Sequence, residues 1–186
     1  IFIFLFSTTI LAKAQTDYNK VNTFLYVNGG ANMASFFQPQ SKSSLEDFKA
    51  IFTPQFGMSI RTEFPLSHIG YEIGGQLARR GSKFSATGET AEIDYAHLYA
   101  DLLLYFPLKN YDDIYVGLGL YGGYAFQGSL KDSSGKSTDI TFGSDTDWRA
   151  FDGGISFKSV YSIKNTLSIG LRYDFGFFPT YLTVDS

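Results

Sequence analysis

The chain has 186 residues, enough for one domain, and its 15 basic and 18 acidic side chains give a formal net charge of −3. No basic stripe is visible, which argues against a nucleic-acid partner, and the absence of cysteine excludes disulfides, thiolate metal sites and cysteine nucleophiles. Phenylalanine, tyrosine and glycine are abundant, with 19, 13 and 19 residues, yet the mean hydropathy of −0.05 is too low for a helical membrane protein.

The first residues resemble a leader. Residues 1–11 are apolar except for Ser7, Thr8 and Thr9, and the Ala12-Lys13-Ala14 that follows matches a signal-peptide cleavage site. We expect residues 1–14 to be the remnant of a signal peptide and residues 15–186 to be the mature domain. The alternative is a short core helix or strand. No second apolar run approaches ~18 residues, so no transmembrane helix is expected.

Seven stretches then alternate apolar and polar residues with a period of two, which predicts β-strands with two different faces. In chain order they are residues 23–36, 53–64, 69–79, 93–106, 114–124, 148–161 and 166–178. In the fourth, Leu98, Leu102 and Leu104 share one face, whereas His97 and Asp101 share the other. These strands exceed the ~5–6 residues usual in soluble sheets and reach the ~9–11 that a tilted strand needs to cross a bilayer.

The connections alternate in length. Long polar loops at residues 37–52, 80–92 and 128–147 alternate with short turns, as in outer-membrane barrels, which have short periplasmic turns and long outer loops. The prediction is an all-β, eight-stranded antiparallel up-and-down transmembrane β-barrel, with seven strands visible and the eighth truncated after residue 178. We expect it in the outer membrane of a Gram-negative-type bacterium. Membrane lipid is one partner, and the three loops would meet an envelope or surface protein or a glycan.

The polar strand faces are expected to fill the lumen, because the apolar faces must meet lipid and an eight-stranded barrel has room inside only for side chains. Buried charges must be paired, which predicts a structural polar network. Its expected members are Arg61, Glu63, Glu72, His97, Asp101, Asp152, Lys158, Arg172 and Asp174, with Gln76. Arg61 is predicted opposite Glu72, and Arg172 within reach of Asp152 and Asp174. The aromatic residues predicted to form an interface girdle are Tyr105, Phe151, Tyr161, Tyr173 and Phe175.

No catalytic, cofactor or metal site is predicted. Residues 135–137 lack the first glycine and the helix of a phosphate-binding loop, and His97 and Asp101 lie ~13 Å apart along a strand, too far for one metal ion. A serine–histidine–acid hydrolase is a minor alternative, because His97 faces inward, away from lipid. Four acids of one outer loop match no calcium-loop spacing. They are Asp132, Asp139, Asp145 and Asp147.

Several local patterns occur in a familiar order between Phe24 and Phe178. They are Gly57, Tyr71-Glu72 with Gly81, Tyr95, residues 117–124, Phe151-Asp152-Gly153-Gly154, and Arg172-Tyr173 with Gly176. In this order and spacing the chain resembles the PorT-like outer-membrane β-barrel family of Bacteroidetes-type bacteria. That family commonly has an acidic residue and then a proline soon after the fourth-strand tyrosine, where this chain has His97 and Tyr99. The resemblance implies an eight-stranded barrel without a single shared activity, although one branch assists protein secretion.

Three functions follow from these observations. The leading prediction is a small structural or interaction barrel with a side-chain-filled lumen and no enzymatic activity. The second is a narrow pore for small solutes, lined by the same charges. The third is a secreted soluble barrel that carries an apolar ligand, as lipocalins do, in which the leucine faces would point inward and the charges outward.

Overall fold

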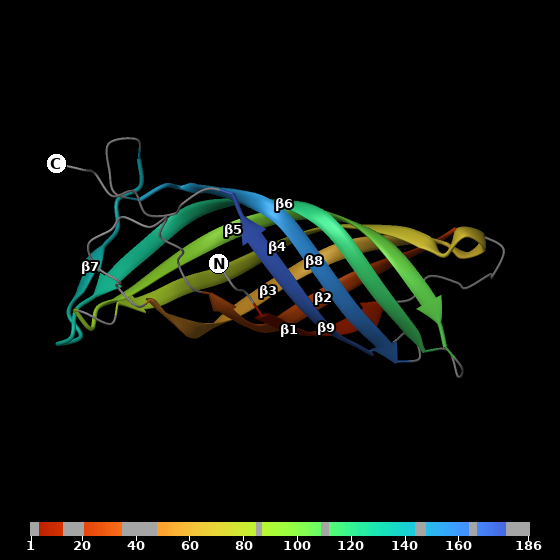
Figure 1. The fold of residues 1–186 in the computed structure, drawn as a ribbon, viewed down its shortest axis with the longest axis horizontal. Coiled ribbons are helices and arrows are strands. Elements are labelled where there is room, and N and C mark those ends of the chain that lie inside the picture. Colours follow the sequence, from red (N-terminus) through yellow and green to blue (C-terminus); the bar gives the residue numbers. More distant parts are fainter. Residues whose placement is uncertain are drawn as a thin grey trace.

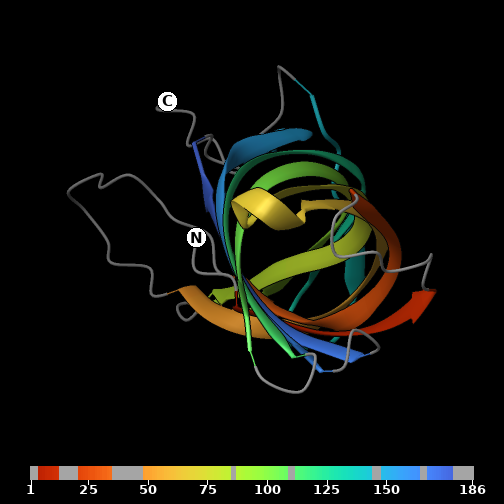
Figure 2. The same ribbon diagram turned by 90° about the vertical axis from the view of Figure 1, so that its right-hand side faces the viewer.

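The computed structural model describes residues 4–12, 21–34, 48–84, 87–108, 112–143, 148–163 and 167–177, in which tilted strands form a closed ring (Figures 1 and 2). The long strands are β1 (Phe4–Ala12), β2 (Asn22–Ala34), β3 (Phe48–Phe64), β4 (Ile69–Phe84), β5 (Thr90–Pro107), β6 (Asp113–Lys131), β8 (Phe151–Ile163) and β9 (Leu167–Gly176). A short strand, β7 (Ser137–Asp139), and one 3-10 turn, η1 (Pro65–Ser67), complete the described elements. No described helix is long and apolar enough to span a membrane.

The ring follows chain order. Successive strands pair antiparallel from β1 to β6, β8 pairs with β6 and β9, and β7 adds only to the outer end of β6. β1 closes the ring between β2 and β9. The prediction of an all-β, antiparallel up-and-down barrel is therefore confirmed.

The strand that closes the ring is not where the sequence predicted it. We expected the eighth strand after residue 178, and residues 178–186 lie outside the described part of the chain. The structure places β1, from the predicted leader, in that position. β1 pairs with β2 from Phe4 to Ala12 but with β9 only from Ser7 to Ile10. Strand pairing does not test cleavage, so the signal peptide stays a prediction.

The two faces of each strand meet opposite environments. On β5, Leu98 and Leu102 are 73% and 61% exposed, whereas His97 and Asp101 are each 2% exposed. The apolar outer face of β5 runs from Ala96 to Phe106, and at ~3.3 Å per residue with a strand tilt of ~40° it forms a belt about 25 Å high, the thickness that lipid requires. The soluble-carrier hypothesis is wrong, because it requires the leucine face to line a cavity.

The predicted loop at residues 80–92 is mostly strand. β4 continues to Phe84 and β5 starts at Thr90, while β3 starts inside the predicted loop 37–52 and β6 extends four residues into the predicted loop 128–147. Figure 1 shows the outer ends of β5 and β6 at the left of the picture, beside β7. The loop was predicted because the outward residues of these strand ends are charged, so the alternation of apolar and polar residues is lost. Arg79 pairs with Asp94 at 2.7 Å and Lys131 with Glu92 at 2.9 Å. Such residues lie above the lipid belt but still belong to the ladder.

An apolar cluster fills the lumen at this outer end. Ala91, Ile93, Tyr95 and Ala125 are buried together. Five partly buried apolar residues pack against them. Three belong to the β6–β8 connection, namely Ile140, Phe142 and Trp148, and the other two are Phe84 of β4 and Leu130 of β6. The connection therefore folds back over the outer mouth of the barrel.

The lipid belt can be tested by placing charge at two depths. Leu102→Arg, in the middle of the β5 outer face, should lower the free energy of unfolding by about 2–4 kcal/mol, because the guanidinium would lie near the bilayer midplane. Gln127→Arg, at the outer end of β6, should cost only about 0–1 kcal/mol. Urea unfolding in lipid vesicles, followed by the fluorescence of the single tryptophan, Trp148, measures both. Equal effects at the two depths would contradict the belt.

Candidate functional site

The central lumen is crossed by a chain of paired charges contributed by five strands. Arg61 comes from β3, Glu72 and Arg80 from β4, Asp101 from β5, Asp152 and Lys158 from β8, and Arg172 and Asp174 from β9. All eight occupy inward positions of the alternating pattern, so one face of each strand delivers them to the same space.

The chain begins with the pair of Arg61 and Glu72. Register places the two residues directly opposite each other, and Arg61 Nε and Nη2 both donate to Glu72 Oε2, at 2.9 and 2.8 Å. The other carboxylate oxygen accepts from Lys158 Nζ at 2.5 Å and from the Tyr99 hydroxyl at 3.3 Å. Both oxygens of this fully buried carboxylate are therefore satisfied.

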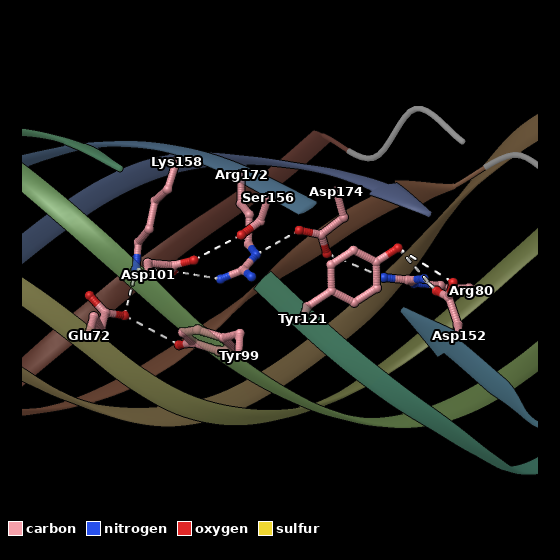
Figure 3. A network of polar contacts seen from close by, with 10 residues as sticks. All are labelled: Glu72, Arg80, Tyr99, Asp101, Tyr121, Asp152, Ser156, Lys158, Arg172 and Asp174. Atoms are coloured by element: carbon pink, nitrogen blue, oxygen red, sulfur yellow. Dashed lines mark hydrogen bonds and ion pairs between the residues drawn. The ribbon is translucent and has the colours of Figure 1, made fainter. Parts of the chain in front are cut away.

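Asp101 continues the chain across the lumen (Figure 3). Its carboxylate lies 4.0 Å from Lys158 Nζ, accepts from Arg172 Nη1 at 3.0 Å, and accepts from the Ser156 hydroxyl at 2.8 Å. Arg172 also donates from Nε to Asp174 at 2.8 Å. The guanidinium of Arg172 thus joins two carboxylates on different strands.

Arg80 completes the chain at the outer side. It contacts Asp174 at 3.3 Å and forms a short ion pair with Asp152, to which the Tyr121 hydroxyl also donates, at 3.3 Å (Figure 3). From Arg61 to Asp152 the signs alternate without interruption, with four cations and four carboxylates. The chain therefore has no formal net charge.

Tyrosine rings surround the cations. The Arg61 guanidinium lies 4.4 Å from the ring centre of Tyr26 and 4.1 Å from that of Tyr115, and Arg172 lies 4.1 Å from that of Tyr99. Such contacts add cation–π attraction in a desolvated interior. Glu63, which the sequence placed in the network, accepts from the Tyr115 hydroxyl at 2.8 Å, and no cation among the described residues forms an ion pair with it.

The structure gives two of the predicted pairs and replaces a third. Arg61 meets Glu72 and Arg172 meets Asp174, but Arg172 does not contact Asp152. The β8–β9 register sets Lys158 opposite Arg172, which leaves Asp152 farther along the strand, where Arg80 reaches it. The prediction of the Arg172–Asp152 contact was wrong for this reason.

Arg80 is the main residue that the sequence analysis missed, because it fell in a predicted loop. Continuing the alternation from Glu72 through Gly74, Gln76 and Ala78 would have placed it inside the barrel. Gln76, by contrast, lies at the edge of the network beside a small cavity.

His97 is buried among aromatic rings, and among the described residues it contacts no candidate nucleophile or acid. Its ring packs 5.4 Å from that of Tyr95 and 5.8 Å from that of Tyr121, and a Cβ atom at Gly123 would approach it to 2.9 Å. In the described part of the chain neither imidazole nitrogen has a hydrogen-bond partner. The hydrolase alternative therefore lacks its nucleophile–base and base–acid contacts here.

The acidic outer loop forms a turn within the residues that can be placed. The Asp132 carboxylate accepts from the Ser134 hydroxyl at 2.7 Å and from the Lys136 amide at 2.9 Å. The Ser134 hydrogen bond lowers the pKa of Asp132. Asp145 and Asp147 lie outside the described residues, and among those described no three acidic or histidine side chains cluster as metal ligands.

A second apolar cluster closes the lumen toward the short turns. It consists of Leu103, Tyr105, Tyr115 and Val160. Tyr105 was predicted to face lipid in the aromatic girdle, but it is 7% exposed and packs inside the barrel, because it lies on the inward face with Asp101. The charged chain therefore lies between apolar clusters at both ends.

The pairing of the chain can be tested at Arg172. Arg172→Ala should lower the free energy of unfolding by about 3–5 kcal/mol, because it removes the cation that two buried carboxylates, Asp101 and Asp174, share. Arg79→Ala is the matched control: Arg79 also binds two carboxylates, but its side chain is 44% exposed, so about 0–1 kcal/mol is expected. Urea titrations of both variants measure the difference. Similar small losses at both positions would contradict a paired, desolvated network.

Comparison with known proteins gives one match. A family model described as outer membrane protein beta-barrel domain matches residues 12–181. Searches of curated proteins and of solved structures found no match. The closed ring, the lipid-facing belt and the polar lumen agree with this family. The chain is a member of the outer membrane protein β-barrel domain family and is located in the outer membrane.

Proposed function

We propose that this barrel is a structural or interaction protein with a closed lumen, and that it acts through its outer end. The observation that supports this most directly is the uninterrupted chain of ion pairs from Arg61 to Asp152. An ion that entered the lumen would have to displace paired, desolvated charges, which is costly.

A small cavity in the described part of the lumen agrees with a closed interior. The cavity beside Arg172 measures about 30 Å³, room for about one water molecule. Apolar clusters lie on either side of the charged chain. These features favour the closed barrel over the narrow-pore alternative.

The outer ends of β4, β5 and β6 supply the surface for partners. They extend above the lipid belt with β7, whose residues are exposed. Arg79, Glu92, Asp94 and Lys131 give this surface both signs of charge. Mixed charge of this kind suits a protein or glycan partner in the envelope.

Within the family, we propose that the chain belongs with the PorT-like proteins. Three residues of that resemblance, Glu72, Asp152 and Arg172, are members of the ion-pair chain. Because one PorT-like branch assists protein secretion, a secretion component is the first partner to test.

The closed lumen predicts an electrical result. The wild-type barrel, reconstituted in planar bilayers and shown to be folded by a heat-dependent gel shift, should give no step currents. A general porin in the same bilayers is the positive control. Reproducible single-channel steps from the wild-type barrel would support the pore instead.

The partner surface predicts where crosslinks form. A photo-crosslinking amino acid at Lys136, in the exposed β6–β7 turn, should capture an envelope protein or glycan in intact cells. The control position is Leu66, which is 86% exposed in the turn at the opposite end. Adducts specific to position 136, analysed by mass spectrometry, are expected. Adducts at position 66 alone would place the interaction on the periplasmic side.

A further inference from the structure

The lipid-facing surface of the barrel is hollowed where β3, β4 and β5 meet. The hollow has a volume of about 350 Å³ and exists because Gly75 faces outward without a side chain. Its apolar walls are Phe56, Met58, Leu77, Ala96 and Leu98. A Cβ atom at position 75 would lie 3.4 Å from Leu98 Cδ2, an ordinary contact, so the fold itself does not require glycine there.

The hollow lies in the outer half of the belt. Along the outward face of β4, Ile69, Tyr71 and Ile73 precede Gly75 on the side of the short turn. Arg79 follows only four residues later, about 13 Å along the strand, and ends the apolar face. Acyl chains of the outer leaflet therefore surround this position.

Positive charge lies above the hollow on the same two strands. Lys49 of β3 is directly opposite Lys83 of β4 in the ladder, so both side chains stand on one face, and both are exposed. Among the described residues neither lysine forms an ion pair. Like charges directly opposite each other destabilise a sheet, and an anion between them would remove that repulsion.

Among the described residues, the two acids on β5 near this end of the barrel do not pair with the lysines. Glu92 and Asp94 lie on β5, where they bind Arg79 and Lys131. Arg79 is held by two hydrogen bonds to Asp94, at 2.7 and 2.9 Å, between the hollow and the lysines. In the part of the chain that the structure describes, the β3–β4 side of the rim is thus cationic, and Lys83 lies eight residues, about 26 Å along β4, beyond Gly75 in the apolar hollow.

We propose that this surface binds one molecule of a lipid with a phosphorylated headgroup, with an acyl chain in the hollow at Gly75 and a phosphate between Lys49 and Lys83. Such a lipid contacts the apolar hollow and the lysine pair at once. A free phosphate would contact only the lysines, and a neutral lipid only the hollow. The site is on the outside of the barrel and does not depend on whether the lumen conducts.

Native mass spectrometry of the folded, detergent-solubilised barrel with added lipid A tests the proposal. The wild-type protein should retain one lipid A and bind diacylglycerol, which has acyl chains but no phosphate, at least about tenfold more weakly, since diacylglycerol offers no anion for charge-assisted hydrogen bonds with the two lysines. Lys49→Glu with Lys83→Glu should weaken lipid A binding at least about tenfold. Gly75→Phe, which fills the hollow, should weaken it similarly.

Gly122→Phe is the matched control for bulk on the lipid face. Gly122 also faces outward, on β6, and a Cβ atom there would lie 4.0 Å from the nearest group, Phe151. This variant should bind lipid A as the wild type does, and a diphosphorylated glucosamine disaccharide without acyl chains should not compete. Wild-type affinity in either the charge-reversal or the Gly75→Phe variant would overturn the proposal, as would an equal loss in Gly122→Phe. A heat-dependent gel shift checks that every variant is folded.

Discussion

The need to pair every buried charge in the lumen constrains the whole barrel. Alternation of apolar and polar residues fixes which face of a strand meets lipid, since a one-residue slip reverses both faces. A slip of two residues would leave the faces unchanged. It would, however, separate Arg61 from Glu72 and leave buried charges without partners, at a cost of several kcal/mol. The ion pairs therefore specify register where the hydrophobic pattern cannot.

The abundance of tyrosine and glycine follows from the same crowded interior. Tyr99 lies over Gly74, where a Cβ atom would approach its ring to 2.5 Å, and His97 lies over Gly123. Each large inward side chain thus occupies the space that a neighbouring glycine leaves. Tyrosine suits these positions because its ring covers a cation and its hydroxyl donates to a carboxylate, as Tyr99 does for Arg172 and Glu72. Composition alone pointed to a barrel because packing of this kind needs both residue types.

The sequence predicted the membrane part of the fold best, because lipid imposes a period of two on at least ten consecutive residues. Above the belt the outward residues are polar as well as the inward ones. The predicted bounds of β4, β5 and β6 therefore stopped short of the outer ends of these strands, and Arg80 was placed in a loop. Contacts across the lumen were harder still. Arg80 on β4 meets Asp152 on β8 and Asp174 on β9 only because the ring is closed, and strand alternation says nothing about which inward residues face one another. The closing strand was missed because a leader and a membrane strand are both apolar runs.

The departure from the PorT-like pattern at His97 can be understood through the charge balance of the lumen. His97 and Arg80 share the rings of Tyr95 and Tyr121, from which Arg80 lies 5.5 and 5.4 Å. A carboxylate at position 97 would compete for Arg80 with Asp152 and Asp174. It would also give the chain of ion pairs five acids against four cations. A histidine keeps the volume filled without adding a negative charge. The substitution is therefore consistent with a lumen in which the other carboxylates already occupy every cation.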